Sequence, residues 1–182
     1  MGLLDRDGWV ASRYQMREKL IDIGDDFWIE DADGNKVFKV DGKALRMRDT
    51  LVLENANGDP VYRVEERKLS IRDKMAIERP DGDTVATIKK AMISPFGDRF
   101  NIDLKDGGEL KAKGSILDHE YEIERDGDKV AEVSKKWFRI RDTYGIEIAK
   151  RQDDALILAI AVCVEYLARG DEDERKAEDE RD

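Results

Sequence analysis

The residue types that most often carry out catalysis are scarce in this sequence and lie far apart. His119 is the only histidine and Cys163 the only cysteine among 182 residues. A lone histidine could act as a general base, but no nucleophile lies near His119 in sequence, so we expect it at the surface or at the start of a strand. Cys163 lies in an apolar stretch, where a thiol keeps its proton and behaves as a small hydrophobic side chain. We therefore predict no catalytic residues.

A metal or cofactor site is also not expected. One histidine and one cysteine cannot supply the soft ligands of a usual zinc site. The segment DADGN at 31–35 resembles part of an EF-hand calcium loop, but Ile29 and Val40 stand where that loop has its first and last ligands. We interpret this segment as a hairpin turn. The phosphate-binding and dinucleotide-binding motifs are missing too, so we predict neither metal nor cofactor.

Two pairs of lysines are the candidate binding residues. Lys89 and Lys90 form the first pair, and Lys135 and Lys136 form the second, which Trp137 follows directly. Lysines next to an aromatic ring suit an anionic membrane surface, where amphipathic rings lie at the depth of the headgroups. The alternative is an ordinary strand end with core aromatics. These four lysines and Trp137 are the predicted lipid contacts.

The charge is concentrated at the end of the chain. Residues 170–182 hold eight acids and three bases, which give half of the net charge of −10. Such a segment is typical of a solvated end, and we predict that it is disordered or frayed. The remainder is mixed in charge and only mildly acidic, which does not favour binding to nucleic acid.

Five Asx-Gly dipeptides at near-regular spacing are the clearest structural signal. Asparagine and aspartate before glycine tolerate the positive φ values of a tight hairpin turn. The flanking residues alternate between apolar and polar, as at 99–104, with the period of a half-buried strand. Five hairpins, with one strand near 14–23 and another at 144–149, predict about twelve strands. The dipeptides are Asp33-Gly34, Asn57-Gly58, Asp81-Gly82, Asp106-Gly107 and Asp126-Gly127.

The segments between the hairpins also repeat. RMRDT at 46–50, SIRDK at 70–74 and RIRDT at 139–143 are separated by about one and three hairpin periods. This repetition suggests one hairpin unit used several times. Propeller blades also repeat hairpins, but a blade usually takes ~40–45 residues and offers no place for the apolar segment near the end of the chain.

That apolar segment, ALILAIAVCV at 155–164, is predicted to form a helix. Asp153 and Asp154 suit the start of a helix, and Arg169 and Gly170 suit its end, so we expect a helix over 154–169. A buried strand is the alternative, because several of these residues are β-branched. A membrane anchor would need about 20 apolar residues, so we favour a core helix.

The predicted helix would fill the interior that the predicted strands enclose. A helix that is apolar on every side must be surrounded by protein or lipid. Barrels of ~8 strands are filled by their own side chains and those of ~16 leave a channel, so twelve strands should enclose a space of intermediate width. A helix is about 10 Å across and would fill that space. We therefore predict a mainly β fold, a closed antiparallel barrel around a central C-terminal helix.

Three long segments resemble one known family. They are YQMREKL at 14–20, GDDFWIEDADGNKVFKVDGKALRMRDTLVL at 24–53 and YRVEERKLSIRDKMAI at 62–77. They resemble the LURP-one-related family, and the resemblance covers most of residues 12–168. It implies a twelve-stranded barrel around a central helix, similar to the tubby C-terminal domain and to phospholipid scramblases. Because tubby-like domains bind phosphoinositides and scramblases act on lipids, the resemblance also implies a lipid hypothesis.

The sequence thus predicts an N-terminal extension at 1–11, a tubby-like barrel with its helix at 12–169 and the acidic tail at 170–182. We expect a non-catalytic binding module that associates with anionic lipid at a membrane surface. We further expect a cytoplasmic monomer that is peripheral to the membrane and does not bind nucleic acid. A scaffold or protein-interaction domain with no lipid role is the alternative, and an enzyme is the least favoured class.

Overall fold

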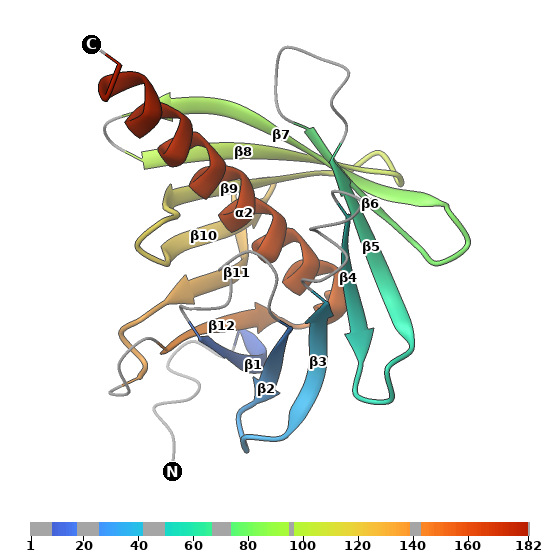
Figure 1. The fold of residues 1–182 in the computed structure, drawn as a ribbon. Helices are drawn as coiled ribbons and strands as arrows, with labels where there is room; N and C mark the ends of the chain where they lie inside the picture. The colour runs from blue at the N-terminus through green and yellow to red at the C-terminus, as the bar shows by residue number, and fades with distance from the viewer. Residues whose placement is uncertain are drawn as a thin grey trace.

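The computed structural model describes residues 9–17, 26–41, 50–66, 74–94, 97–138 and 143–181, which form twelve strands and one long helix (Figure 1). The strands are β1 Val10–Arg17, β2 Phe27–Asp31, β3 Lys36–Asp41, β4 Thr50–Asn55, β5 Pro60–Glu66, β6 Lys74–Glu78, β7 Thr84–Ser94, β8 Gly97–Leu104, β9 Glu109–Ser115, β10 Glu120–Arg125, β11 Asp128–Ser134 and β12 Thr143–Ala149. The helix, α2, is Asp154–Asp179.

The strands form one closed antiparallel barrel. Each strand pairs with the next along the chain, and β12 pairs with β1 to close the circle. The residue pairs of that closing seam run from Val10↔Ala149 to Arg17↔Thr143. Closure leaves no exposed sheet edge, which is the feature that otherwise invites aggregation. The predicted mainly β fold, a closed barrel of about twelve strands with a C-terminal helix, is confirmed.

The five predicted hairpin turns are all present. Their glycines have φ values between 83° and 91° and lie between β2 and β3, β4 and β5, β6 and β7, β8 and β9, and β10 and β11. In the first turn, the carboxylate of Asp31 accepts hydrogen bonds from the backbone N–H groups of Asp33 and Asn35, both at 2.9 Å. The DADGN segment is therefore a hairpin turn, as predicted.

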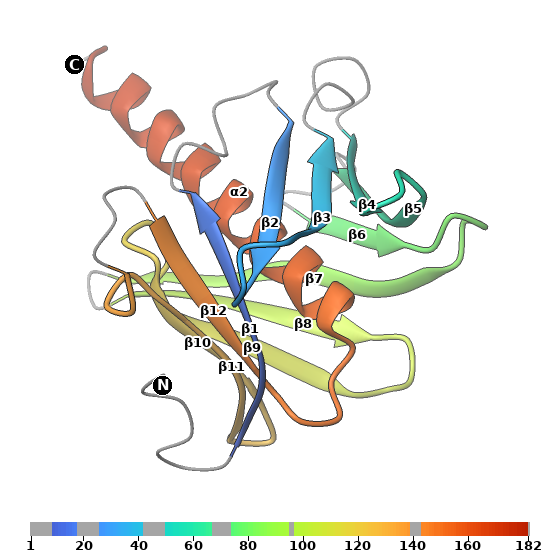
Figure 2. The same ribbon diagram turned by 90° about the horizontal axis from the view of Figure 1, so that it is seen from below.

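The barrel has two different ends. Because neighbouring strands alternate in direction, all five Asx-Gly turns lie at one end, which we call the turn mouth. β12 also ends there, so α2 begins at the turn mouth and runs through the barrel. It leaves at the opposite end, the exit mouth, and its second half projects beyond the strands (Figure 1 and Figure 2).

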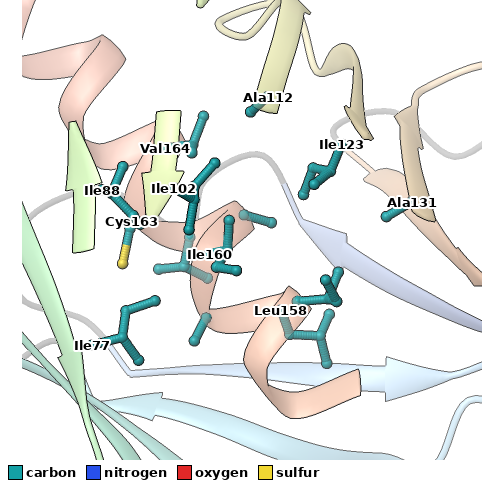
Figure 3. Close-up of a cluster of buried hydrophobic side chains, with 14 of the residues drawn as sticks. Ile77, Ile88, Ile102, Ala112, Ile123, Ala131, Leu158, Ile160, Cys163 and Val164 are labelled. Atoms are coloured by element: carbon teal, nitrogen blue, oxygen red, sulfur yellow. The ribbon is translucent and has the colours of Figure 1, made fainter. Parts of the chain in front are cut away.

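The first half of α2 is the centre of the hydrophobic core. All residues from 157 to 164 are buried, whichever side of the helix they occupy. Inward-facing strand residues such as Ile77, Ile102 and Ile123 pack around them (Figure 3). Cys163 is fully buried among them, and burial raises the pKa of its thiol. The thiol is therefore protonated and serves as a small hydrophobic group, as predicted.

The helix does not end where the sequence predicted. It continues past Arg169 and Gly170 to Asp179, so the prediction of a disordered or frayed tail from residue 170 is wrong over this range. Gly170 does not take the positive φ of a helix-ending glycine. The extension is rich in good helix formers and carries an ion pair one turn apart, Lys176 to Glu172 at 2.7 Å.

Two other boundary predictions are refined. The first strand begins at Val10, inside the segment assigned to an N-terminal extension, and its expected second half at 18–23 lies outside the described residues. The RMRDT, SIRDK and RIRDT repeats also lie mostly outside them.

Gly114→Ala is expected to destabilise the barrel by about 2–5 kcal/mol, because it combines strain with overlap. Gly114 has a φ of 137°, and an added Cβ would lie 2.6 Å from the carbonyl oxygen of Glu120. The matched control is Gly34→Ala, where φ is also positive but no atom lies within 4 Å of the added Cβ. That variant should lose only about 1–2 kcal/mol. Urea unfolding of both proteins measures the difference, and equal losses would contradict the close approach at Gly114.

Candidate functional site

The two predicted lysine pairs do not form one surface. Lys89 and Lys90 lie on β7, whereas Lys135 and Lys136 follow β11, and three strands separate β7 from β11 in the barrel. The ammonium of Lys89 forms an ion pair with Asp103. Lys136 is 81% exposed, and its Nζ lies 3.7 Å from a carboxylate oxygen of Glu120. Only the second pair lies at a barrel end, the exit mouth.

The ring of Trp137 is held against the barrel and is less exposed than that of an aromatic residue that inserts into a membrane. Its ring is half-buried and packs over Gly145 of β12, where an added Cβ would lie 3.0 Å from Trp137 Cε3. The guanidinium of Arg13 lies 5.4 Å from the centroid of the same ring, in a cation–π contact. Trp137 therefore helps to cover the outside of the barrel next to Lys135 and Lys136.

His119 was expected at the surface or at the start of a strand, and the structure contradicts only the surface position. His119 is 2% exposed and lies in the core at the exit mouth, just before β10. Its ring stacks on Tyr144 with 3.9 Å between centroids, and its Nδ1 lies 3.3 Å from the carboxylate of Glu165 on α2. His119 has a φ of 54°, and the sequence pattern HEYEIE did not indicate its burial.

Glu165 is the acceptor of a fully enclosed polar cluster. Its two carboxylate oxygens accept hydrogen bonds from Tyr121 OH at 2.8 Å and Tyr144 OH at 2.7 Å. Burial, followed by the charge of Glu165, raises the pKa of Tyr121, which keeps that hydroxyl protonated as a donor. The cluster fixes the rotation and depth of α2 in the barrel. Because its members are buried, it offers a substrate no direct access.

A pocket of about 510 Å³, the mouth pocket, opens at the turn mouth beside the start of α2. Four cationic side chains line it: Arg79, Lys105, Arg125 and Arg151. Arg79 and Lys105 both form ion pairs with Asp83. Arg125 and Arg151 have no ion-pair or hydrogen-bond partner within the part of the chain that the structure describes, and the Nε of Arg125 is buried. The lining of the mouth pocket thus holds four cations and two carboxylates, Asp106 and Asp153.

The carboxylates of the mouth pocket are already engaged by the protein itself. Asp153 caps α2 by accepting the N–H of Leu156 at 3.0 Å, and its other oxygen accepts Tyr62 OH at 2.6 Å. Burial and this hydrogen bond raise the pKa of Tyr62, which remains a donor. Asp106 accepts the N–H of Gly108 at 2.9 Å. Neither carboxylate is paired with Arg125 or Arg151.

Apart from Gln152, the remaining wall of the mouth pocket is apolar. It is formed by Val85, Leu104 and Leu110 from the strands and by Leu156 and Ile157 from α2. A pocket with apolar walls and a few convergent polar groups is the usual form of a small-molecule site. This arrangement can bind an anion that carries an apolar part.

A second pocket of about 470 Å³ lies against β8 to β11 and is less suited to a charged ligand. Its acids outnumber its three bases, and two of these bases, Lys113 and Lys136, lie near Glu124 and Glu120, respectively. The mouth pocket is therefore the better candidate site.

Sequence reasoning missed the mouth pocket, although a signal for it exists. Lys105 and Arg125 each directly precede an Asx-Gly turn, and Arg79 precedes one by two residues. Arg151 precedes the helix cap Asp153 by two residues. Once the five turns and the start of the helix are placed at one end of a barrel, these bases must gather there.

Two other features, a metal-binding cluster and a membrane-spanning helix, are absent from the described residues. No group of three or more histidine, cysteine, aspartate or glutamate side chains could hold a metal ion there. In the same part of the chain, no helix has both the length and the apolar character needed to cross a membrane.

The fold defines the class of protein, a β-barrel filled by an apolar C-terminal helix. Residues 12–165 match the model of the LURP-one-related family, so this chain belongs to that family. It is 30% identical to an uncharacterised protein, YxjI, from Bacillus subtilis over 160 residues, which cover 87% of this chain and 95% of YxjI. An X-ray structure of a protein from Arabidopsis thaliana matches with a TM-score of 0.63, covering 93% of this chain and 98% of that one. At 19% identity, that likeness shows the fold alone.

Proposed function

We propose that this protein is a non-catalytic binding module for an anionic lipid. The observation that carries the proposal is the mouth pocket, where two arginines that no described residue pairs with lie beside an apolar wall. A lipid offers the matching chemistry, an anionic headgroup joined to an apolar chain. The enclosure of His119 and Glu165, the pair closest to acid–base chemistry, supports binding over catalysis.

The lysines predicted from the sequence remain a second contact surface within the same proposal. Lys135, Lys136 and Trp137 lie at the exit mouth, where a membrane could meet two positive charges and a ring. The acidic extension of α2 leaves the barrel at the same end and should oppose approach to an anionic surface. Lys89 and Lys90 lie elsewhere on the barrel and would not join this contact.

At low salt, we expect the intact protein to associate with vesicles that contain anionic lipid and to carry lipid away from them. The measurement is co-sedimentation. The protein in the pellet reports association with vesicles, and the lipid that accompanies protein in the supernatant reports lipid carried away from them. Deleting residues 171–182 should strengthen association at low salt and matter little at high salt, where charges are screened. Lys135→Ala/Lys136→Ala should weaken vesicle association about tenfold or more if these lysines touch the membrane.

Purely zwitterionic vesicles are the control, because they offer the same interface without the charge. The lipid function is wrong if no vesicle binds the protein and no lipid accompanies it in any of these conditions. A scaffold or protein-interaction domain would then be the better description.

A further inference from the structure

The mouth pocket is sized for one small ligand. Its volume of about 510 Å³ lies within the range of ~300–1,000 Å³ that is usual for small-molecule sites. The acyl chains of a two-chain lipid would exceed it, whereas one alkyl chain could lie against Leu104 and Leu156, which are both partly exposed. The size of the pocket therefore limits the ligand to one alkyl chain, which its charge alone would not do.

We propose that the mouth pocket takes a single-chain anionic amphiphile, with its phosphate or carboxylate headgroup held by Arg125 and Arg151. This inference rests on the proposed function and narrows it from anionic lipid in general to one molecule with one chain. The ligand enters the turn mouth as an individual molecule, and the mouth pocket does not dock on a bilayer surface.

The two arginines supply the reason for an anionic headgroup. A buried guanidinium N–H without a partner is rare, because such a group has lost its water without gaining a hydrogen bond. Arg125 Nε is in that condition, and the carboxylates of the mouth pocket are already engaged by other donors. Guanidinium groups match the geometry of phosphate and carboxylate oxygens, and such charge-assisted hydrogen bonds are strong.

The conformation of Arg151 adds an independent reason. Arg151 has a φ of 64°, in the left-handed region that glycine occupies without strain. A glycine at this position would make the turn before α2 more stable. The strained position thus places a cationic side chain on the mouth pocket at the expense of stability, as is common for residues that bind ligands.

The rim of the turn mouth argues against docking on a bilayer. The tips of the surrounding turns carry exposed aspartates, among them Asp33, Asp81 and Asp126. A flat anionic membrane would meet these carboxylates before it reached the arginines, and like charges repel. A single amphiphile can pass between the turns and avoid most of this repulsion.

Isothermal titration calorimetry with hexyl, octyl and decyl phosphate, each kept below micelle-forming concentrations, tests the proposal. Each added CH₂ should tighten binding about three- to fourfold. Arg125→Ala and Arg151→Ala should each weaken decyl phosphate binding about tenfold or more. Arg99→Ala is the matched control, because Arg99 is an exposed arginine of β8 near the exit mouth. This variant should bind decyl phosphate with unchanged affinity.

Arg151→Gly separates a binding role from a structural one. Glycine relieves the positive φ and removes the cation, so the thermal midpoint should rise while decyl phosphate binding weakens about tenfold or more. Unchanged affinity in Arg151→Gly and Arg125→Ala would overturn the assignment of the headgroup site.

Competing ligands decide the remaining alternatives. If inorganic phosphate binds as tightly as decyl phosphate, the site binds free anions and the amphiphile proposal is wrong. Equal binding of a decyl glucoside would instead show that the headgroup charge is irrelevant, which also overturns it. If no alkyl phosphate binds but anionic vesicles do, this inference fails while the proposed lipid function stands. If neither binds, both fail.

Discussion

Ile160→Asp is expected to leave no folded protein at 25 °C. Ile160 is fully buried in the first half of α2, inside the closed barrel and among apolar strand residues (Figure 3). An uncompensated charge in such a core costs several kcal/mol, which is comparable to the whole stability of many domains. Circular dichroism and thermal unfolding of the purified variant measure the result. Ile160→Val, which keeps the apolar character, should lose only about 0.5–1.5 kcal/mol.

Truncations test the same dependence without a buried charge. A chain that stops before Asp153 lacks α2 and should not fold, because the barrel interior would be empty. A chain that stops after Gly170 keeps the buried stretch of α2 from Ile157 to Ala168 and should retain a cooperative transition. A cooperative thermal transition in the shorter chain would contradict the account of a barrel that needs its central helix.

Glu165→Leu is expected to destabilise the protein by about 2–4 kcal/mol, although leucine is the more hydrophobic residue. The carboxylate accepts from Tyr121 and Tyr144, and both hydroxyls are buried. Without it, these donors lose their partner in a place that water does not reach. Urea unfolding gives the loss, and a change below about 0.5 kcal/mol would show that the cluster contributes little to stability.

A double-mutant cycle with Tyr121→Phe isolates the hydrogen bond itself. Tyr121→Phe takes one donor from the buried carboxylate, and Glu165→Leu takes this acceptor from both tyrosine hydroxyls, whereas Glu165→Leu/Tyr121→Phe removes both partners of the Tyr121–Glu165 bond. The double variant should therefore be more stable than the sum of the two losses predicts, with a coupling energy of about 1–3 kcal/mol. Losses that simply add would contradict a direct interaction between Tyr121 and Glu165.

Local sequence signals were sufficient for the fold. A positive φ at Gly34 or Gly127 is required by two or three neighbouring residues, so the dipeptide alone predicts the turn. The start of α2 is equally local, because the Asp153 side chain caps an N–H only three residues away. The end of α2 was missed because Gly170 is tolerated within a helix when the following residues, such as Glu172 and Lys176, support another turn.

The polar sites depend on contacts that no local pattern encodes. Tyr121, Tyr144 and Glu165 meet only because β10, β12 and α2 converge at one depth in the barrel. Arg125 and Arg151 are 26 positions apart, and the turn and the helix cap beside them indicate a shared pocket only after the topology has placed both at one barrel end. Prediction of such sites requires the topology first, followed by the identity of the side chains at each barrel end.

Nuclear magnetic resonance mapping of the bound ligand tests the central functional claim most directly. The experiment titrates decyl phosphate into isotope-labelled protein and follows the backbone amide signals. We predict that the shifted signals cluster at the mouth pocket, at residues 104–110, 125 and 151–157, while those of 135–137 remain unchanged. Shifts confined to Lys135, Lys136 and Trp137, or no shifts at all, would contradict the assignment of ligand binding to the mouth pocket.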